Sequence, residues 1–534
     1  MMVGVLVVAF VLSCLVGVAW FWWEGVYAIW GWSISVIGAM LHEFSVDLLL
    51  SNVSWGFIYM LLLCGSISLW YCFHYYSCGK EDLKGLHYLM VGFLEVMFLL
   101  VLTGSLMPSL IFWEFLGFVS FVLVLYYANP RSMRASLIVL VASRLGDVSL
   151  FFLVGHFQNW VGMCDFIAIL FFLLVGLTKS ATYPFISWLV EAMRAPTPVS
   201  CLVHSSTLVT AGVWFFFRYS AISGLSEGAL FVVLIASFVT IFVSGLAALF
   251  FSDLKEVVAL STCNNVAWCL VFFVLGEESM ALLQLVTHGI CKCCLFITFG
   301  DLMCSSGGSQ SAVGVYFARY SGVFLIFLGA LVVVSLCGVP FLGVFFSKHG
   351  LFAEVCYLGK ISLYPFLSLG FVLSYAYSFR LVLLLVGSLG GLSFGYFKGF
   401  LLVSLTGFVG TAINWWGISG SSVVVELGVL NSVVLLLVNL VGFICGYLVY
   451  ILDLKRNLFN LASLMMSNGV VKWLYGCYLG FTDSSVLSLF RWEHWLIGLL
   501  VGRRWAAKLQ LPLFSFNAIF LGMGLLLFWY LTCG

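Results

Sequence analysis

The stretch "FFLLVGLTKSATYPF", residues 171–185, begins as an ordinary membrane helix and then departs from that pattern. Lys179 lies inside the apolar run, and Pro184 follows shortly after it. A charged side chain inside a bilayer is costly, and proline removes a helix hydrogen bond. Both are tolerated where a helix unwinds, because the freed carbonyls can be satisfied by water and by an ammonium group. The stretch therefore predicts a broken membrane helix that holds a lysine at its break.

The composition is that of a polytopic membrane protein. Of 534 residues, 63% are hydrophobic and only 8% are charged. A soluble domain of this composition would have too few charged residues to cover its surface. The net charge of +1 provides no general attraction for nucleic acid. Residues 1–23 end in Trp20–Trp23 without a small-residue cleavage site, so we expect a first spanning helix rather than a signal peptide.

We expect an all-α membrane fold of about fifteen crossings, each an apolar run long enough to span a bilayer. Residues 24–51 fit poorly as a helix and predict a short strand or hairpin. Two crossings, 163–195 and 319–358, are too long for one unbroken span, and each contains a Pro-Phe step. The other expected crossings are 3–23, 52–76, 87–107, 109–128, 135–156, 198–220, 226–250, 254–275, 279–303, 361–386, 397–417, 424–452 and 515–532.

The two long crossings suggest an internal duplication. Lys179 precedes the proline of its span, whereas Lys348 follows its own, and this reversal favours an inverted repeat. The chain then divides into N-terminal helices with the hairpin (1–107), a first half (108–250), a second half (251–386), C-terminal helices (387–452), a surface segment (453–514) and a last membrane helix (515–534).

The surface segment has the spacing of an amphipathic helix. Leu454, Leu458, Leu461 and Met465 form an apolar stripe, and basic residues lie off that stripe. We expect a lateral helix along the membrane surface; a plain connecting loop is the alternative, although about 60 residues is long for one.

Positive charge alternates between the connections, with Lys360 as the main exception. Under the positive-inside rule, the basic side faces the compartment in which the protein is made, which puts the N-terminus on that side and the C-terminus opposite. The basic residues are Lys80, Lys84, Arg131, Arg134, Arg194, Lys255, Arg319, Lys398, Lys455 and Arg456.

Ionisable residues recur inside the predicted spans, where such groups usually face the bundle interior or a water cavity. Burial favours the neutral forms of lysine and glutamate and a nearby opposite charge restores the charged forms, so both can load and release protons. A series that includes three lysines predicts a proton path rather than an accident. The series is Glu95, Glu114, Arg144, Asp147, Lys179, His204, His288, Lys292, Lys348, His349 and Arg380.

Spacing assigns some of these residues to pairs. His288 and Lys292 are four residues apart and share one helix face, which favours a relay over the hydrogen-bonded structural histidine that would otherwise be expected. Arg144 and Asp147 are three apart and predict a structural ion pair, with Asp147 able to tune Lys179. We expect Glu114 and Lys179 to approach across neighbouring helices.

The 17 cysteines first suggest a metal or redox protein. They lie mostly alone in apolar runs, and adjacent residues such as Cys293 and Cys294 cannot converge on one metal. Small buried hydrophobic side chains are the better interpretation. The abundance of Phe and Gly is the bias of a T- and G-rich coding strand, a hint at an organelle gene.

Several stretches together resemble a known family. "WLVEAMRAPTPVSCLVHSSTLVTAGVWFFFR" (188–218) looks like the signature of the NADH dehydrogenase subunit 5 family, whose members are antiporter-like subunits of mitochondrial complex I. The resemblance covers residues 110–385 in order. Further matches are "WEFLGFVSFVL" (113–123), "SRLGDVSL" (143–150), "SDLKEVVALST" (252–262), "LVTHGICKCCLF" (285–296), "GVPFLGVFFSKH" (338–349) and "SYAYSFRLV" (374–382).

The resemblance implies a proton path through Glu114, Lys179, His204, His288, Lys292 and Lys348, with Arg144, Asp147 and His349 in support. Gln284 stands where a further relay histidine is common, so the path there is expected to use water. His349 replaces the usual acidic residue after Lys348, and the N-terminus is one helix short of the family pattern.

The function implied is proton translocation in NADH:ubiquinone oxidoreductase, as a subunit without a redox centre of its own. NADH, FMN, iron–sulfur clusters and ubiquinone are expected on other subunits, and no metal on this chain. The expected partners are those subunits, above all a neighbouring antiporter-like one. The chain is expected in the mitochondrial inner membrane, in contact with its lipids, cardiolipin among them. The N-terminus is expected in the matrix and the C-terminus in the intermembrane space. A cation/proton antiporter subunit of the same fold is the alternative, and a passive scaffold is disfavoured because it would not need buried lysines.

Overall fold

The computed structural model describes residues 30–35, 45–76, 80–157, 165–223, 226–306, 308–311, 317–318, 322–357, 361–386, 390–391, 409–415 and 429–455, with a few positions between 476 and 492. The chain forms two compact units, residues 1–467 and 468–534. The expected crossings at 3–23 and 515–532 and most of the lateral segment 453–514 lie outside the described residues, and their predictions stand untested.

The first unit is built almost entirely of helices. Ten helices within the described ranges are long and apolar enough to cross a membrane, which confirms a polytopic all-α protein. The helices are α2 (Asn52–Tyr75), α3 (Lys80–Leu102), α4 (Leu106–Leu125), α5 (Pro130–Phe157), α6 (Asp165–Lys179), α7 (Ser187–Glu191), η2 (Ala192–Arg194), α8 (Thr197–Ser205), α9 (Leu208–Ser223), α10 (Glu227–Phe250), α11 (Leu254–Leu275), α12 (Glu278–Ser305), α13 (Gly322–Cys337), α14 (Phe345–Tyr357), η3 (Ile361–Leu363), α15 (Tyr364–Val386) and α17 (Val429–Lys455).

A short hairpin precedes the bundle, as the sequence predicts for residues 24–51. Strands β1 (Trp30–Ser35) and β2 (Ser45–Leu50) pair antiparallel, with Trp30 opposite Leu50. The Arg218 guanidinium, on α9, donates to the Leu49 carbonyl, to Ser51 Oγ and to the Thr103 carbonyl. A further pair of two-residue strands, β3 (Phe317–Ala318) and β4 (Gly390–Gly391), is parallel.

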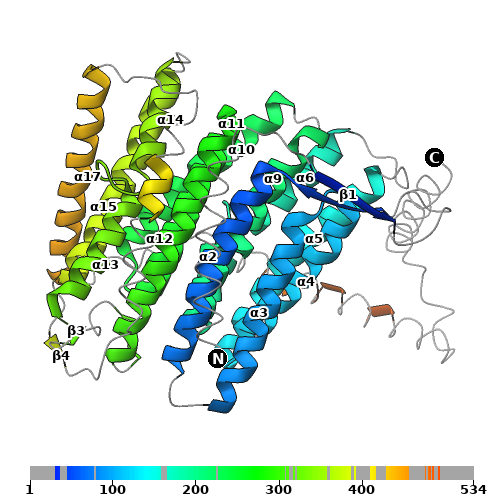
Figure 1. Cartoon of the computed structure of the whole chain (residues 1–534), viewed down its shortest axis with the longest axis horizontal. Coiled ribbons are helices and arrows are strands. Elements are labelled where there is room, and N and C mark those ends of the chain that lie inside the picture. Colours follow the sequence, from blue (N-terminus) through cyan, green and yellow to red (C-terminus); the bar gives the residue numbers. More distant parts are fainter. Residues whose placement is uncertain are drawn as a thin grey trace, which may run out of the picture. The chain divides into compact units, whose positions relative to one another are not determined.

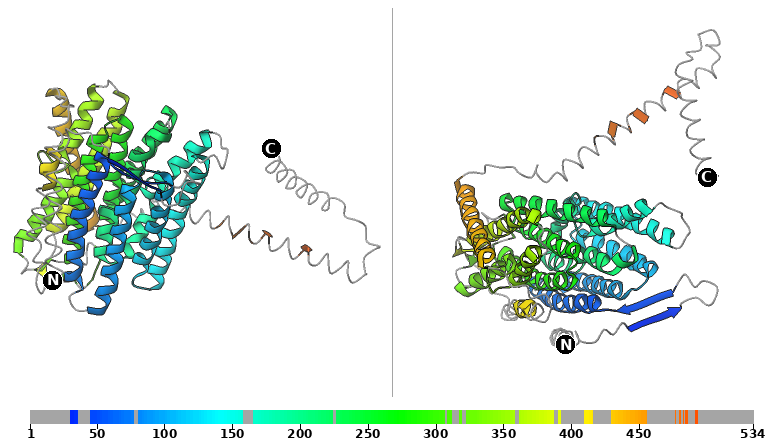
Figure 2. Two further views of the ribbon diagram at one scale, coloured as in Figure 1. Left: turned by 45° about the vertical axis from the view of Figure 1, so that its right-hand side comes forward. Right: turned by 90° about the horizontal axis from the view of Figure 1, so that it is seen from above.

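Helix α12 is the core of this unit. It packs against α2, α8, α11 and α13, and its residues 280–300 are all buried. Figures 1 and 2 show α3, α4 and α5 along one edge of the bundle and α15 with α17 along the other. Helices at the edges expose apolar side chains such as Phe151 on α5 and Leu437 on α17, which a bilayer or neighbouring membrane helices can cover.

Both predicted helix breaks are present. Helix α6 ends at Lys179 and the chain becomes helical again only at Ser187, with Ala181 in the left-handed region at φ 54°. Helix α13 ends at Cys337 and α14 begins at Phe345, across Gly338 at φ 86° and Gly343 at φ 52°. A lysine ends the helix before the first break, and Lys348 lies in the helix after the second, in the reversed order that the sequence predicts.

Candidate functional site

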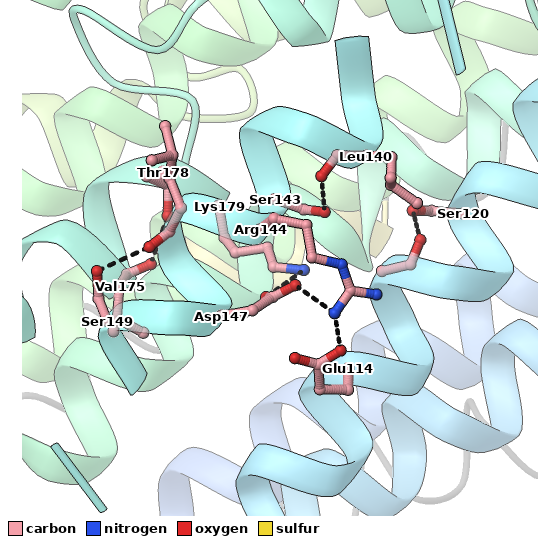
Figure 3. Close-up of polar contacts among 12 residues, drawn as sticks. Glu114, Ser120, Leu140, Ser143, Arg144, Asp147, Ser149, Val175, Thr178 and Lys179 are labelled. Atoms are coloured by element: carbon pink, nitrogen blue, oxygen red, sulfur yellow. Dashed lines mark hydrogen bonds and ion pairs between the residues drawn. The ribbon is translucent and has the colours of Figure 1, made fainter. Parts of the chain in front are cut away.

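The first buried lysine lies at the end of α6. Lys179 is 1% exposed, and its Nζ lies 3.7 Å from Asp147 Oδ1 on α5 (Figure 3). The same Nζ lies 5.2 Å from the centre of the Trp113 ring on α4. A Cβ built on Gly117 of α4 would lie 3.5 Å from the same Nζ. Gly117 therefore lies directly beside the ammonium group, which is placed between α4, α5 and α6.

The expected meeting of Glu114 and Lys179 is indirect. Glu114 binds Arg144, and Arg144 Nη1 lies 3.6 Å from Asp147 Oδ2, so four side chains form the series Glu114–Arg144–Asp147–Lys179 (Figure 3). The reason is the packing order, because α5 contacts both α4 and α6 and inserts its own charged pair between them. The predicted Arg144–Asp147 pair is present, and Asp147 is the acidic group that faces Lys179.

The series runs from a half-exposed end to a buried end. The side chains of Glu114 and Arg144 are about two fifths exposed, at 39% and 40%, whereas those of Asp147 and Lys179 are both 1% exposed. Its charges alternate in sign, so a proton or a side-chain movement at the outer end changes the field felt by the inner lysine.

The two lysines of the second half are held by neutral acceptors. Lys292 on α12 is 0% exposed, as predicted, and its Nζ donates to the Val258 carbonyl at 3.0 Å and to Ser261 Oγ. Lys348 on α14 donates to the Cys337 carbonyl at 2.9 Å and to Ser374 Oγ at 3.3 Å. Cys337 is the last residue of α13, so the carbonyl freed by the break does bind an ammonium group.

The two histidines of the predicted path are buried. His204 on α8 and His288 on α12 are 1% and 0% exposed. His204 Nδ1 and both ring nitrogens of His288 have no hydrogen-bond partner within the described part of the chain. The rings of His204 and Phe296 lie 6.1 Å apart, which brings α8 against α12. The ring of His349, in contrast, is half-buried and lies 5.4 Å from that of Phe345 on the same helix.

Two charges of the predicted series have other surroundings. Arg380 donates to the carbonyls of Ala248 and Phe251 at 3.0 Å and caps the C-terminus of α10, which is a structural role. Glu95 on α3 is exposed at the edge of the bundle. Sequence position alone could not separate either of them from the buried path.

The sequence did not single out the neutral members of the site, which are Trp113, Gly117, Ser261 and Ser374. Tryptophan, glycine and serine are common in membrane helices, so the sequence does not mark these four residues. Their position beside the lysines results from the packing of the helices. The expected burial of the cysteines is confirmed for Cys201, Cys291, Cys293 and Cys294. Within the described ranges no three His, Cys, Asp or Glu side chains are grouped to hold a metal ion.

Comparison with known proteins places this arrangement in a family. The family model described as "NADH:quinone oxidoreductase/Mrp antiporter, TM" matches residues 103–374, which include every lysine and histidine of the path. The chain belongs to this family of membrane subunits. Its matched region contains both helix breaks and the series from Glu114 to Lys179.

Individual relatives agree with that assignment. The chain is 31% identical over 429 residues to NADH-ubiquinone oxidoreductase chain 5 of Artemia franciscana, covering 75% of this chain and 77% of the relative. It is 32% identical over 361 residues to the protein of the same name from Aedes aegypti, covering 64% of this chain. The match spans 61% of the length of the Aedes protein.

A solved structure shows the same fold. A chain in the Mrp complex from Dietzia sp. superposes with a TM-score of 0.71 at 19% identity, covering 93% of this chain and 60% of that one. The antiporter family fold therefore extends beyond the matched region to most of the chain.

Proposed function

We propose that the chain is a proton-translocating membrane subunit of respiratory complex I, NADH:ubiquinone oxidoreductase. The observation that carries the proposal is the set of three lysines inside membrane helices, with exposed fractions of 1%, 0% and 4% for Lys179, Lys292 and Lys348. Charged groups at such depth are costly, and a scaffold would gain nothing from them. The similarity to NADH-ubiquinone oxidoreductase chain 5 supports the assignment to complex I rather than to another ion-moving assembly.

The first half offers a way to couple charge movement to protonation. Arg144 and Lys179 share one carboxylate, since their nitrogens lie 3.6 and 3.7 Å from the two oxygens of Asp147. When Arg144 moves toward Glu114, Asp147 is left to stabilise the charged form of Lys179. When Arg144 moves toward Asp147, part of that stabilisation is lost and Lys179 releases its proton.

The energies are of the right size. Two unit charges 4 Å apart interact by about 4 kcal/mol at an effective dielectric constant near 20. Moving one charge against 100 mV requires about 2.3 kcal/mol. A shift of one arginine between two carboxylates is therefore sufficient to move a proton on or off Lys179 against a working membrane potential.

The second half stores the proton on Lys292 and Lys348. The contacts of Lys292 are a carbonyl and a hydroxyl, which stabilise an ammonium group less than a carboxylate would. A lysine held in this way responds to charges that arrive nearby. His204 and His288 supply imidazoles, whose two ring nitrogens can accept a proton on one side and donate one on the other.

The proposal also covers the cofactors, the location and the neighbouring subunits of the chain, and its support here is the similarity to NADH-ubiquinone oxidoreductase chain 5. The chain supplies no redox chemistry, and NADH, FMN, iron–sulfur clusters and ubiquinone bind other subunits of the complex. It lies in the mitochondrial inner membrane beside a second antiporter-like subunit, with the basic connections in the matrix. The similarity in fold to a chain of the Mrp complex keeps cation/proton antiport as the second candidate.

The test is a lysine replacement in the assembled complex. Lys292→Met keeps the length of the side chain and removes its charge, so the subunit should still assemble, because replacing a buried charge with an apolar group often costs little stability. The number of protons pumped per NADH oxidised in proteoliposomes should fall by about half or more, an expectation based on loss of the proton carrier. Lys84→Met, at an exposed position on α3, should pump as the wild type does.

Undiminished pumping in Lys292→Met would refute the proposed path. Sodium/proton exchange by the purified complex, without NADH-oxidising activity in the same preparation, would favour the antiporter instead.

A further inference from the structure

A network of neutral side chains joins the segment of α12 that contains His288 to the segment of α14 that contains Lys348. Ser347, next to Lys348 on α14, donates to Gln284 Oε1 on α12. Asn414, in the helical residues 409–415, donates from Nδ2 to Ser347 Oγ at 3.2 Å and to Thr287 Oγ1 at 3.3 Å. All four side chains are at most 1% exposed. Three separate helices therefore direct polar groups to one buried point.

The network is incompletely satisfied by the protein. Gln284 Nε2 and Asn414 Oδ1 are buried without a hydrogen-bond partner among the residues described, and so are both ring nitrogens of His288. Each such group is unfavourable if it stays unpaired, because it has lost its hydrogen bonds to water. Buried polar groups of this kind are normally paired through ordered water, which makes about three hydrogen bonds to groups that would otherwise stay unpaired. The arrangement fits a water site better than a closed structural network.

The position of the network matters for the path. Gln284 and His288 are four residues apart, so they share one face of α12, and Thr287 is adjacent to His288. Lys292 is four residues beyond His288 on the same face of α12, and Lys348 directly follows Ser347 on α14. None of the four network side chains gains or loses a proton near neutral pH. Water held here can conduct a proton between the two lysines, but the side chains cannot store it.

We propose that Gln284, Thr287, Ser347 and Asn414 form a binding site for ordered water that connects His288 to Lys348, with Asn414 as its positioning residue. The proposal rests on the proposed function and adds to it a residue outside the matched family region, which ends at residue 374. Asn414 bridges α12 and α14 through one amide nitrogen, so its loss would separate the hydroxyls of Thr287 and Ser347.

The experiment compares two threonines of α12. Thr287→Val removes a hydroxyl that accepts from Asn414, whereas Thr298→Val removes one that donates to the Leu295 carbonyl of its own helix. Asn414→Leu and Thr287→Val should lower the number of protons pumped per NADH at least about twofold and raise the solvent deuterium isotope effect on pumping, as expected when a hydrogen-bonded water chain is interrupted. Thr298→Val should leave both unchanged. Gln284→His should retain pumping and make it depend on pH, because imidazole can gain and lose a proton whereas the amide of Gln284 cannot.

Lys292→Met is measured in parallel to separate the two proposals. If it pumps normally, the proposed function fails and the water site fails with it. If it does not pump but Asn414→Leu and Thr287→Val match the wild type, only the water site is wrong. A loss in Thr298→Val equal to that in Thr287→Val would also overturn the water site, because it would show general sensitivity of α12.

Discussion

Asp147 is the residue on which the first half depends, because among the described residues it is the carboxylate that pairs with both Arg144 and Lys179. Removing its charge would leave two cations near one another with only Glu114, on the half-exposed side, to balance them.

We predict that Asp147→Asn lowers the pumping rate roughly tenfold or more, since loss of a close counter-charge exceeds the 1.4 kcal/mol that corresponds to one factor of ten. The amide is the same size, so assembly should change little. Proton uptake by proteoliposomes at a fixed rate of NADH oxidation measures the effect. Glu227→Gln, at the exposed start of α10, is the matched control. A normal rate in Asp147→Asn would mean that Lys179 needs no counter-charge.

At the scale of elements, the two helix breaks differ in what their freed backbone groups bind. In the second break the Cys337 carbonyl accepts from Lys348. In the first, the Thr178 carbonyl accepts from Trp188 Nε1 at 2.9 Å, and Lys179 turns to a carboxylate instead. Lys348 is therefore held at its helix break by the dipole of a backbone carbonyl, whereas Lys179 is held at the other break by the charged carboxylate of Asp147.

The second break depends on Gly343. Its φ is 52°, and a Cβ there would lie 2.2 Å from the Ser335 carbonyl oxygen, closer than such atoms approach. We predict that Gly343→Ala destabilises the subunit by roughly 1–3 kcal/mol through backbone strain and displacement of α13. Gly329→Ala, inside α13 with Leu385 Cδ1 3.6 Å away, should be neutral or stabilising because alanine favours helix by about 1 kcal/mol. The midpoint of thermal disassembly of the complex would compare the two, and equal midpoints would contradict the strain argument.

At the scale of the whole molecule, hydrophobic runs and charge were sufficient to predict most of the architecture. The expected 254–275 crossing coincides with α11, and the breaks follow from Lys179–Pro184 and Pro340 because prolines and charges in apolar runs have few solutions. The sequence could not predict that α5 lies between α4 and α6, so the indirect contact of Glu114 with Lys179 was beyond it. Asn414 could not be predicted either, because a single asparagine in an apolar run does not indicate a polar network until its spatial neighbours are known.

Three of the basic connections, those beside Lys80, Arg194 and Lys255, meet at one end of the bundle. Lys255 Nζ donates to the Ala195 carbonyl beside Arg194, and His74, just before the connection that contains Lys80, pairs with Asp301 near the end of α12. These contacts bring together the end of α2, the start of α8, the start of α11 and the end of α12, which is the alternation that the positive-inside rule requires.

We predict that this end faces the matrix, as expected for connections rich in lysine and arginine on the side of synthesis. Asn129→Cys, exposed between α4 and α5, should react with a membrane-impermeant maleimide only from the matrix side in inside-out inner-membrane vesicles. Gly228→Cys, at the exposed start of α10, lies at the opposite end by helix count and should react only from the intermembrane side. Each variant is the control for the other, because both cysteines are accessible and differ only in the face on which they lie. Reaction of Asn129→Cys in intact mitoplasts, where only the intermembrane face is exposed, would reverse the orientation and with it the direction in which Lys179, Lys292 and Lys348 are loaded.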